Sequence, residues 1–399
     1  MLGRASSPPR VATLVALTAI STLSLNMFLP SLVDMADDFG APYAQISLSI
    51  AGYLAVTSVL QLVIGPMSDR FGRRPVILVA MAVFLLASLG CLLAQSIEVF
   101  LTFRMLQGAV IAGAALSPAI VRDTLPVRQA ASMLGYIAMA MAIVPMLGPV
   151  LGGALDQLFG WRSSFLVFAV AGAGLVGLVW TDLGETNASP NPEFSQQFRA
   201  YAPLLRSGQF WGYASCMAFS TGGFYIFLAG APLVSRTLFA TSAGALGVYI
   251  GSITAGFFMG SLISGRLASR VSLGFMMLVG RIVAGAGPSV GIALFWAGYM
   301  HELTLFGATI FVGIGNGITM PSSSAGVMSI NPKLAGTASG LAGALTVGMG
   351  AVLTTISGIV VTAHTSASAL LGLMLASSVL GLLAALWTLR SGQSEPEAN

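Results

Sequence analysis

The sequence has little charge, and this scarcity decides the class of protein. Only 8% of its 399 residues are Asp, Glu, Lys or Arg, whereas 56% are hydrophobic and the mean hydropathy is +0.90. An average soluble domain carries about 25% charged residues. Because so few charges cannot cover a water-facing surface, we expect an integral membrane protein.

Cysteine and histidine are also scarce. Cys91 and Cys216 lie in apolar runs, and the only histidines are His301 and His364. Their positions offer neither a disulfide framework nor the spacing of metal ligands. No nucleotide-binding loop and no nucleophile–base set stands out. We therefore expect no cofactor, no metal and no enzymatic activity.

Twelve stretches are long and apolar enough to cross a bilayer, which takes about 20 residues. The first follows Arg4 and Arg10 and is too long for the core of a signal peptide, so it is interpreted as a membrane helix. The predicted spans are 11–33, 44–66, 75–96, 98–121, 131–155, 160–181, 208–233, 243–266, 273–298, 302–325, 334–360 and 364–389.

A polar segment with three prolines, residues 182–207, separates six predicted helices from the next six. We expect an N-terminal bundle over residues 1–181, a cytoplasmic linker over 182–207 and a C-terminal bundle over 208–399. GPMSDRFG at 65–72 also aligns with GRLASRVS at 265–272. These features predict an all-α protein of two pseudo-symmetric six-helix bundles, a design that recurs in transporters.

The positive charges indicate the orientation. With both termini in the cytoplasm, 13 of the 17 Lys and Arg residues fall on the inner side, and only Arg162 and Arg236 on the outer side. Cytoplasmic loops of membrane proteins are enriched in Lys and Arg, so both termini are predicted to be cytoplasmic. The net charge of +4 therefore reflects topology, and no nucleic-acid partner is expected.

One cytoplasmic loop, GPMSDRFGRRPVIL at 65–78, is unusually rich in charge. Its arginines would anchor it at the anionic inner leaflet, but anchoring does not explain the spacing of the glycines and the acid. Gly65 would permit close approach of helices and Gly72 a tight turn. Asp69 would accept from a helix N-terminus or pair with an arginine.

This loop resembles the G-x-x-x-D-R-x-G-R-R/K signature of the major facilitator superfamily. LTFRMLQGAVIAGAA at 101–115 and IVPMLGPVLGG at 143–153 resemble the family motifs of helices four and five, the latter typical of exporters. NMFLP at 26–30, RD at 122–123 and AGTASGLAG at 335–343 resemble the bicyclomycin- and chloramphenicol-resistance (Bcr/CflA) branch of drug:proton antiporters. The resemblance covers nearly the whole chain.

The resemblance implies a fold, a cytoplasmic gate and an exporter motif. Asp69, Arg73 and Asp123 would form a charge network that helps to lock the two bundles while the cavity faces outward. The expected gate residues are Gly65, Asp69, Arg70, Gly72, Arg73, Arg74, Arg122 and Asp123. In helix five we expect close packing and a kink at Pro145, Gly148, Pro149, Gly152 and Gly153.

Arg104 is the main candidate for contact with a substrate. An arginine at the centre of the bilayer costs about 2.5–3.5 kcal/mol on insertion scales, so it should face a cavity or a partner. Arg281 could equally snorkel to the interface. Other candidates for the substrate cavity are Asn26, Tyr53, Gln107, Tyr136, Met139, Phe219, Phe224, Tyr225, Tyr249 and Asn316. Asn316 could instead hydrogen-bond a neighbouring helix.

Asn26 stands where relatives in this branch often carry an acid, and the remaining candidate acids lie at helix ends: Asp34, Asp69, Glu98, Asp123 and Asp156. An asparagine cannot exchange protons, which leaves the coupling group open. Arg104 without an opposing carboxylate should disfavour cations, so a neutral or anionic substrate is expected.

The sequence as a whole predicts a monomeric exporter of small amphipathic compounds in the bacterial inner membrane, surrounded by lipid and coupled to protons. The alternative is a facilitator or importer of a small neutral or anionic metabolite.

Overall fold

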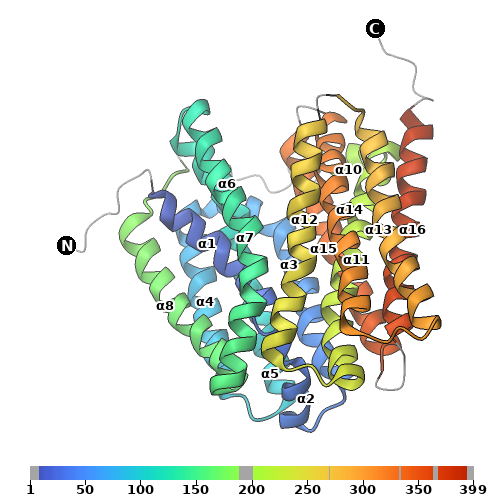
Figure 1. Cartoon of the computed structure of the whole chain (residues 1–399). Helices are drawn as coiled ribbons and strands as arrows, with labels where there is room; N and C mark the ends of the chain where they lie inside the picture. Colours follow the sequence, from blue (N-terminus) through green and yellow to red (C-terminus); the bar gives the residue numbers. More distant parts are fainter. Residues whose placement is uncertain (1–8, 188–200, 269, 332–333, 363–366, 393–399) are drawn as a thin grey trace. The chain divides into compact units, whose positions relative to one another are not determined.

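The structure, a computed structural model, describes residues 9–187, 201–268, 270–331, 334–362 and 367–392, without the side chains of 127, 128, 131, 138–140 and 142. Throughout these residues the regular secondary structure is helical (Figure 1). The chain forms two compact units. Unit 1 comprises Met1–Ser195 with Ala243–Gly247, and unit 2 comprises Gln196–Ser242 with Val248–Asn399.

Unit 1 contains six apolar helical segments, two of which are interrupted. Their elements are α1 (Val11–Asn26), η1 (Leu29–Ser31), α2 (Leu32–Phe39), α3 (Tyr43–Phe71), α4 (Arg73–Leu93), α5 (Ile97–Leu106), η2 (Gln107–Val110), α6 (Ile111–Thr124), α7 (Val127–Phe159) and α8 (Arg162–Asp182).

Unit 2 contains a short helix and the rest of the long ones. They are α10 (Tyr201–Leu205), α11 (Gly208–Phe239), α12 (Ala243–Leu267), α13 (Leu273–Trp296), α14 (Glu302–Ser329), α15 (Ala335–Val360) and α16 (Ala367–Gly392). The first five residues of α12 belong to unit 1.

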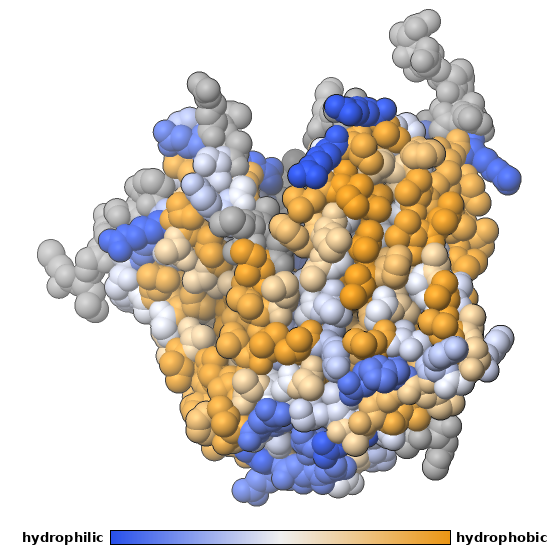
Figure 2. Space-filling view, in the orientation of Figure 1, coloured by the Kyte–Doolittle hydropathy of each residue, from blue (hydrophilic) through white to orange (hydrophobic). Residues whose placement is uncertain are grey.

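The helices agree with the predicted membrane spans in number and order. Eleven segments among the described residues are long and apolar enough to cross a membrane, and Ile143–Phe159 of α7 supplies a shorter apolar stretch. Figure 2 shows hydrophobic residues along the middle of the helices and hydrophilic residues mainly toward their ends. The all-α membrane class is therefore confirmed.

Two predicted spans are not continuous α-helices. Residues 11–33 were expected as one helix, but α1 ends at Asn26 and a 3-10 turn, η1, precedes α2. Pro30 lies in that turn; proline has no N–H to donate, so it weakens the helical ladder. Residues 98–121 are likewise divided by η2, directly after the turn that carries Arg104.

Glycines bring the backbones of α12 and α14 together in unit 2. A Cβ at Gly256 or Gly260 would collide with carbonyl oxygens of α14, and a Cβ at Gly313 or Gly317 would collide with carbonyl oxygens of α12. Small residues four apart permit such contact between membrane helices. These glycines therefore serve helix packing, as their spacing predicts.

Candidate functional site

The charged loop joins α3 to α4 through a single residue. Gly72 has φ +95°, in the left-handed region that favours glycine, and a Cβ there would collide with the Glu185 carboxylate. The predicted tight turn is therefore confirmed. Among the described residues, no heavy atom lies within 4 Å of a Cβ built at Gly65, so close approach of helices at this position stays a prediction.

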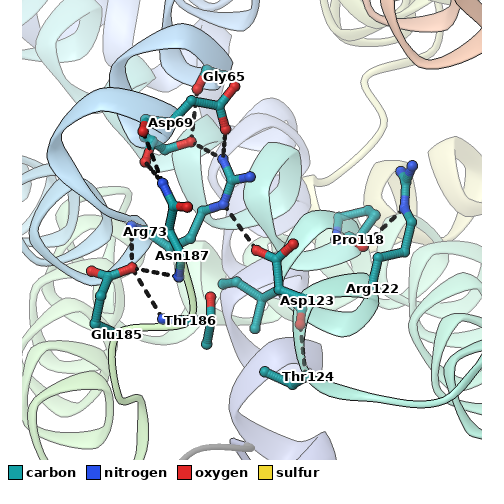
Figure 3. Close-up of polar contacts among 12 residues, drawn as sticks. Gly65, Asp69, Arg73, Pro118, Arg122, Asp123, Thr124, Glu185, Thr186 and Asn187 are labelled. Atoms are coloured by element: carbon teal, nitrogen blue, oxygen red, sulfur yellow. Dashed lines mark hydrogen bonds and ion pairs between the residues drawn. The ribbon is translucent and has the colours of Figure 1, made fainter. Parts of the chain in front are cut away.

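Arg73 is the centre of the charge network, and its partners come from both neighbouring segments. Its guanidinium lies 2.6 Å from the Asp69 carboxylate of α3 and 3.2 Å from the Asp123 carboxylate of α6, and it also donates to the Ser68 hydroxyl (Figure 3). The Arg73 side chain is 12% exposed and the two carboxylates are 27% and 28% exposed, so the pairs are partly buried. The contacts expected among these three charged residues are present, all within unit 1.

Glu185 and Asn187, in the segment that follows α8, hydrogen-bond the loop, and the sequence did not indicate this role for either residue. The Glu185 carboxylate accepts from the backbone N–H groups of Arg73, at 2.9 Å, and Arg74, at 3.2 Å. The Asn187 amide donates to the carbonyl oxygen of Asp69 at 2.8 Å. Glu185 thus satisfies unpaired amides at the start of α4, and Asn187 satisfies a carbonyl at the end of α3.

The other arginines of the predicted gate make contacts of a different kind. The Arg74 guanidinium donates to the carbonyl oxygen of Trp180 at 2.9 Å and lies over its ring, and Arg70 lies over the ring of Phe71. Arg122 donates to the carbonyl oxygen of Pro118, one turn earlier on its own helix, at 3.3 Å. A gating role for this group stays a prediction.

Arg104 is fully buried in unit 1, where neutral groups surround it. It donates to the carbonyl oxygen and hydroxyl of Ser24, the carbonyl oxygen of Ser49 and the side-chain oxygen of Gln107, at 2.6–3.2 Å. The rings of Phe28 and Tyr53 lie 4.4 Å from the guanidinium carbon. Arg104 thus joins α1, α3 and α5, and no carboxylate among the described residues pairs with it.

Gln107 and Tyr53 belong to the same buried cluster. The Gln107 amide donates to the Ser88 hydroxyl of α4 at 2.8 Å, and the Tyr53 hydroxyl lies 3.4 Å from the carbonyl oxygen of Ser21. The structure thus brings together three of the predicted cavity residues as one packed network. Contact with a substrate stays a prediction for all three.

Asn26 lies at the end of α1 and is 3% exposed. Its amide nitrogen donates to the carbonyl oxygen of Thr22 at 2.9 Å, while its side-chain oxygen has no donor among the described residues. Gly148 of α7 is close by, since a Cβ there would lie 3.5 Å from that of Asn26. A buried amide oxygen without a donor is therefore available at this position.

The helix-five motif lies on α7, which contains Pro145 and Pro149. Gly152 is the closest packing point, because a Cβ there would collide with the carbonyl oxygen of Met27 in the turn after α1. Gly153 is buried beside it. Close packing is thus present at this motif, and its use in an export cycle stays a prediction.

The predicted cavity residues of unit 2 lie on three of its helices, α11, α12 and α14. Phe224 and Tyr225 are neighbours on α11, and Phe219, one to two turns earlier, is partly buried. Tyr249 of α12 instead stacks on Phe306.

Of the two candidates on α7, Tyr136 is 52% exposed, and the side chain of Met139 lies outside the described residues.

Tyr249 leads to an acid that sequence reasoning missed. Glu302 begins α14 and accepts from the Tyr249 hydroxyl at 2.8 Å and from the Thr241 hydroxyl. Between residues 194 and 394 it is the only acid in the sequence. That isolation is a signal that could have identified it.

Arg281 is buried, so the expectation that it might snorkel is wrong. It is 1% exposed, and it donates from Nε to the Thr319 hydroxyl at 3.1 Å and from Nη2 to the Asn316 side-chain oxygen at 2.7 Å. Asn316 therefore forms a hydrogen bond with a neighbouring helix, which is one of the two roles predicted for it.

Several known proteins are similar to this chain in sequence. The chain is 29% identical over 377 residues to the uncharacterized MFS-type transporter YdgK of Bacillus subtilis, with 92% of each chain covered. It is 29% identical over 335 residues to multidrug resistance protein D of Escherichia coli, covering 83% of this chain and 84% of that protein. A chloramphenicol resistance protein of Pseudomonas aeruginosa is 33% identical over 220 residues, covering 53% and 51%.

Solved structures and a family model confirm the fold. A bacterial homologue of the human lysosomal transporter Spinster, in an inward-facing conformation, superposes with a TM-score of 0.75 at 16% identity, covering 98% of each chain. The model of the Major Facilitator Superfamily matches residues 14–355. The named relatives also agree with the Bcr/CflA-type resemblance of the motifs. This chain belongs to the Major Facilitator Superfamily.

Proposed function

We propose that this protein is a secondary active exporter of small amphipathic compounds that works by alternating access. The observation that carries the proposal is similarity over most of the chain to a protein named for multidrug resistance. The exporter-type motif on α7, with its close packing at Gly152, supports the same direction of transport. As a member of a transporter family, the protein moves its substrate and does not transform it.

The cargo is a neutral or anionic compound. Arg104 places a positive charge in the interior of unit 1 without a paired carboxylate among the described residues. Its contacts are all neutral, so its field is only partly compensated and opposes an approaching cation. The free oxygen of Asn26 adds an acceptor for an N–H or O–H group of the cargo.

Inward proton flow drives export, and the two candidate proton carriers are Asp34 and Glu302. Asp34 lies in the first turn of α2, and Glu302 lies at the start of α14 between two hydroxyl donors. Asn26, which stands where an acid would be expected, cannot take this role. Asp34→Asn and Glu302→Gln variants that export down a gradient but lose proton dependence would identify the carrier.

We propose that the protein lies in the bacterial inner membrane as a monomer, with both termini in the cytoplasm. The distribution of Lys and Arg supports this orientation. The arginine loop between α3 and α4 would then meet the anionic head groups of the inner leaflet.

A facilitator or importer of a small neutral or anionic metabolite is the second candidate. Asn26 favours it, because a buried asparagine in place of an acid removes one route for proton coupling. Transport that is unaffected by collapse of the proton gradient would support this candidate over the exporter.

A growth-inhibition panel in an efflux-deficient bacterial host tests the proposal. It compares the native protein with Arg104→Ala and Asp69→Asn at matched expression, against neutral, anionic and cationic drugs. We expect protection by the native protein against chloramphenicol-like neutral compounds, and its loss in both variants. Absence of protection across the panel would contradict drug export, and best protection against ethidium would contradict the assignment of cargo charge.

A further inference from the structure

The buried arginine of unit 2, Arg281, has features of a binding site that is separate from the cargo contacts proposed for Arg104 and Asn26. It is 1% exposed and projects from α13 toward α14. Both of its hydrogen-bond acceptors, Thr319 and Asn316, are neutral. An arginine keeps its positive charge in proteins, so this unit encloses a cation.

The countercharge is missing from the surroundings of this cation. Between residues 194 and 394 the only acid in the sequence is Glu302. Glu302 lies 14 residues before Asn316 on the same helix, which corresponds to about 21 Å along the axis at 1.5 Å per residue. Buried charges in proteins are normally paired, so Arg281 lacks the partner that its burial requires.

Nη1 of Arg281 and the hydroxyl of Ser323 are both buried, and neither has an oxygen or nitrogen partner among the described residues. Ser323 lies one turn after Thr319 on the face of α14 that meets Arg281, and the group beside its hydroxyl is the Cys216 thiol, which hydrogen-bonds only weakly. Buried polar groups are seldom left unsatisfied, so a missing ligand is indicated.

Arg104 provides the contrast within the same chain. Four hydrogen bonds and two aromatic rings surround its guanidinium, and Nη1 is engaged twice. Arg281 makes two hydrogen bonds, both from other nitrogens. Gly381 of α16 faces it: a Cβ there would lie 3.0 Å from Cδ and 3.7 Å from Nη1 of Arg281, and 3.5 Å from Cβ of Phe219, so α16 itself offers no side-chain partner at this point.

We propose that Nη1 of Arg281 and the hydroxyl of Ser323 bind a small monovalent anion in the interior of unit 2. Both groups donate hydrogen bonds, and the guanidinium supplies the charge, so the ligand is an anion and not a metal ion. A free halide and a carboxylate group share this chemistry. Anion binding here does not depend on which compound the protein exports.

Thermal unfolding of the purified protein in detergent tests the site, followed by tryptophan fluorescence. Chloride or acetate replaces gluconate, a carboxylate too bulky for a small buried site, at constant ionic strength, so that general screening does not change. A ligand that binds the folded state raises the unfolding midpoint in a saturable way. We expect chloride to do so in the native protein; a shift with acetate alone would assign the site to a carboxylate.

Three variants separate the site from general charge effects. Arg281→Gln should lose the anion-dependent shift, and Ser323→Ala should weaken apparent binding about fivefold, the loss of one hydrogen bond. Arg266→Gln, which removes an exposed arginine at the end of α12, should keep the full shift.

The proposal fails if the native midpoint is the same in all three anions, or if Arg281→Gln keeps the shift. Should Arg281→Gln yield no folded protein, Ser323→Ala decides, and unchanged anion dependence in that variant would overturn the proposal.

Discussion

Replacing Arg73 with glutamine should destabilise unit 1 far more than the same change at Arg122. Arg73 pairs with Asp69 and Asp123, and its side chain is 12% exposed. Arg122 is exposed, and its one partner among the described residues is a carbonyl oxygen of its own helix. Figure 3 shows Arg73 between the two carboxylates and Arg122 directed away from them. The two positions therefore form a matched pair.

The expected magnitude follows from the geometry of the two ion pairs. Exposed pairs contribute about 0.2–1 kcal/mol each, and removing one partner of a fully buried pair costs about 3–5 kcal/mol. The Arg73 pairs lie between these limits. Losing both pairs also leaves two carboxylates without their shared cation, so the free energy of unfolding should fall by about 2–4 kcal/mol. At Arg122 the change should stay within about 0.5 kcal/mol.

The two cysteines allow this difference to be measured. Cys91 and Cys216 are both fully buried, so a thiol-reactive fluorophore labels them only as the protein unfolds. A midpoint drop of about 4–16 °C is expected for Arg73→Gln, at about 2–4 °C per kcal/mol for units near this size. Equal midpoints for the two variants would refute the view that Arg73 holds α3, α4 and α6 together.

Four further substitutions test unit 1 by the same unfolding assay. Gly152→Ala should lower the free energy of unfolding by more than about 3 kcal/mol, because its Cβ would meet a backbone carbonyl that cannot move aside. Gly65→Ala should be neutral or slightly stabilising. Equal unfolding midpoints for these two variants would contradict the close packing at Gly152. Glu185→Gln should lower the free energy of unfolding by about 1 kcal/mol, because it weakens two charge-assisted hydrogen bonds to the start of α4. An unchanged unfolding midpoint would show that water can replace the carboxylate there. Arg104→Gln should cost about 3–5 kcal/mol by leaving buried acceptors unpaired, and a stable, fully expressed variant would contradict that role.

The fold could be predicted from the sequence because lipid imposes a simple rule. Apolar runs of bilayer length determine the helices, and the distribution of arginines determines the loops. The breaks at η1 and η2 were not predicted, since a hydropathy pattern does not show where an α-helix tightens into a 3-10 turn.

The site was predictable only where a local motif describes it. Asp69, Gly72 and Arg73 lie within five residues, so their spacing alone indicated a turn with an ion pair. Glu185 and Asn187 were not predicted, because each lies more than 100 residues along the sequence from the loop residue that it bonds. The sequence could indicate that such groups need partners, but the fold selects which partners they meet.

Uptake into inverted membrane vesicles would distinguish proton-driven export of neutral or anionic compounds from facilitated transport and from export of cations. Vesicles containing the native protein are energised, and uptake of labelled chloramphenicol and of ethidium is followed before and after a protonophore is added. We predict uptake of chloramphenicol that stops when the proton gradient collapses, with little uptake of ethidium. Ethidium uptake that exceeds that of chloramphenicol, or uptake of either that ignores the gradient, would contradict the account.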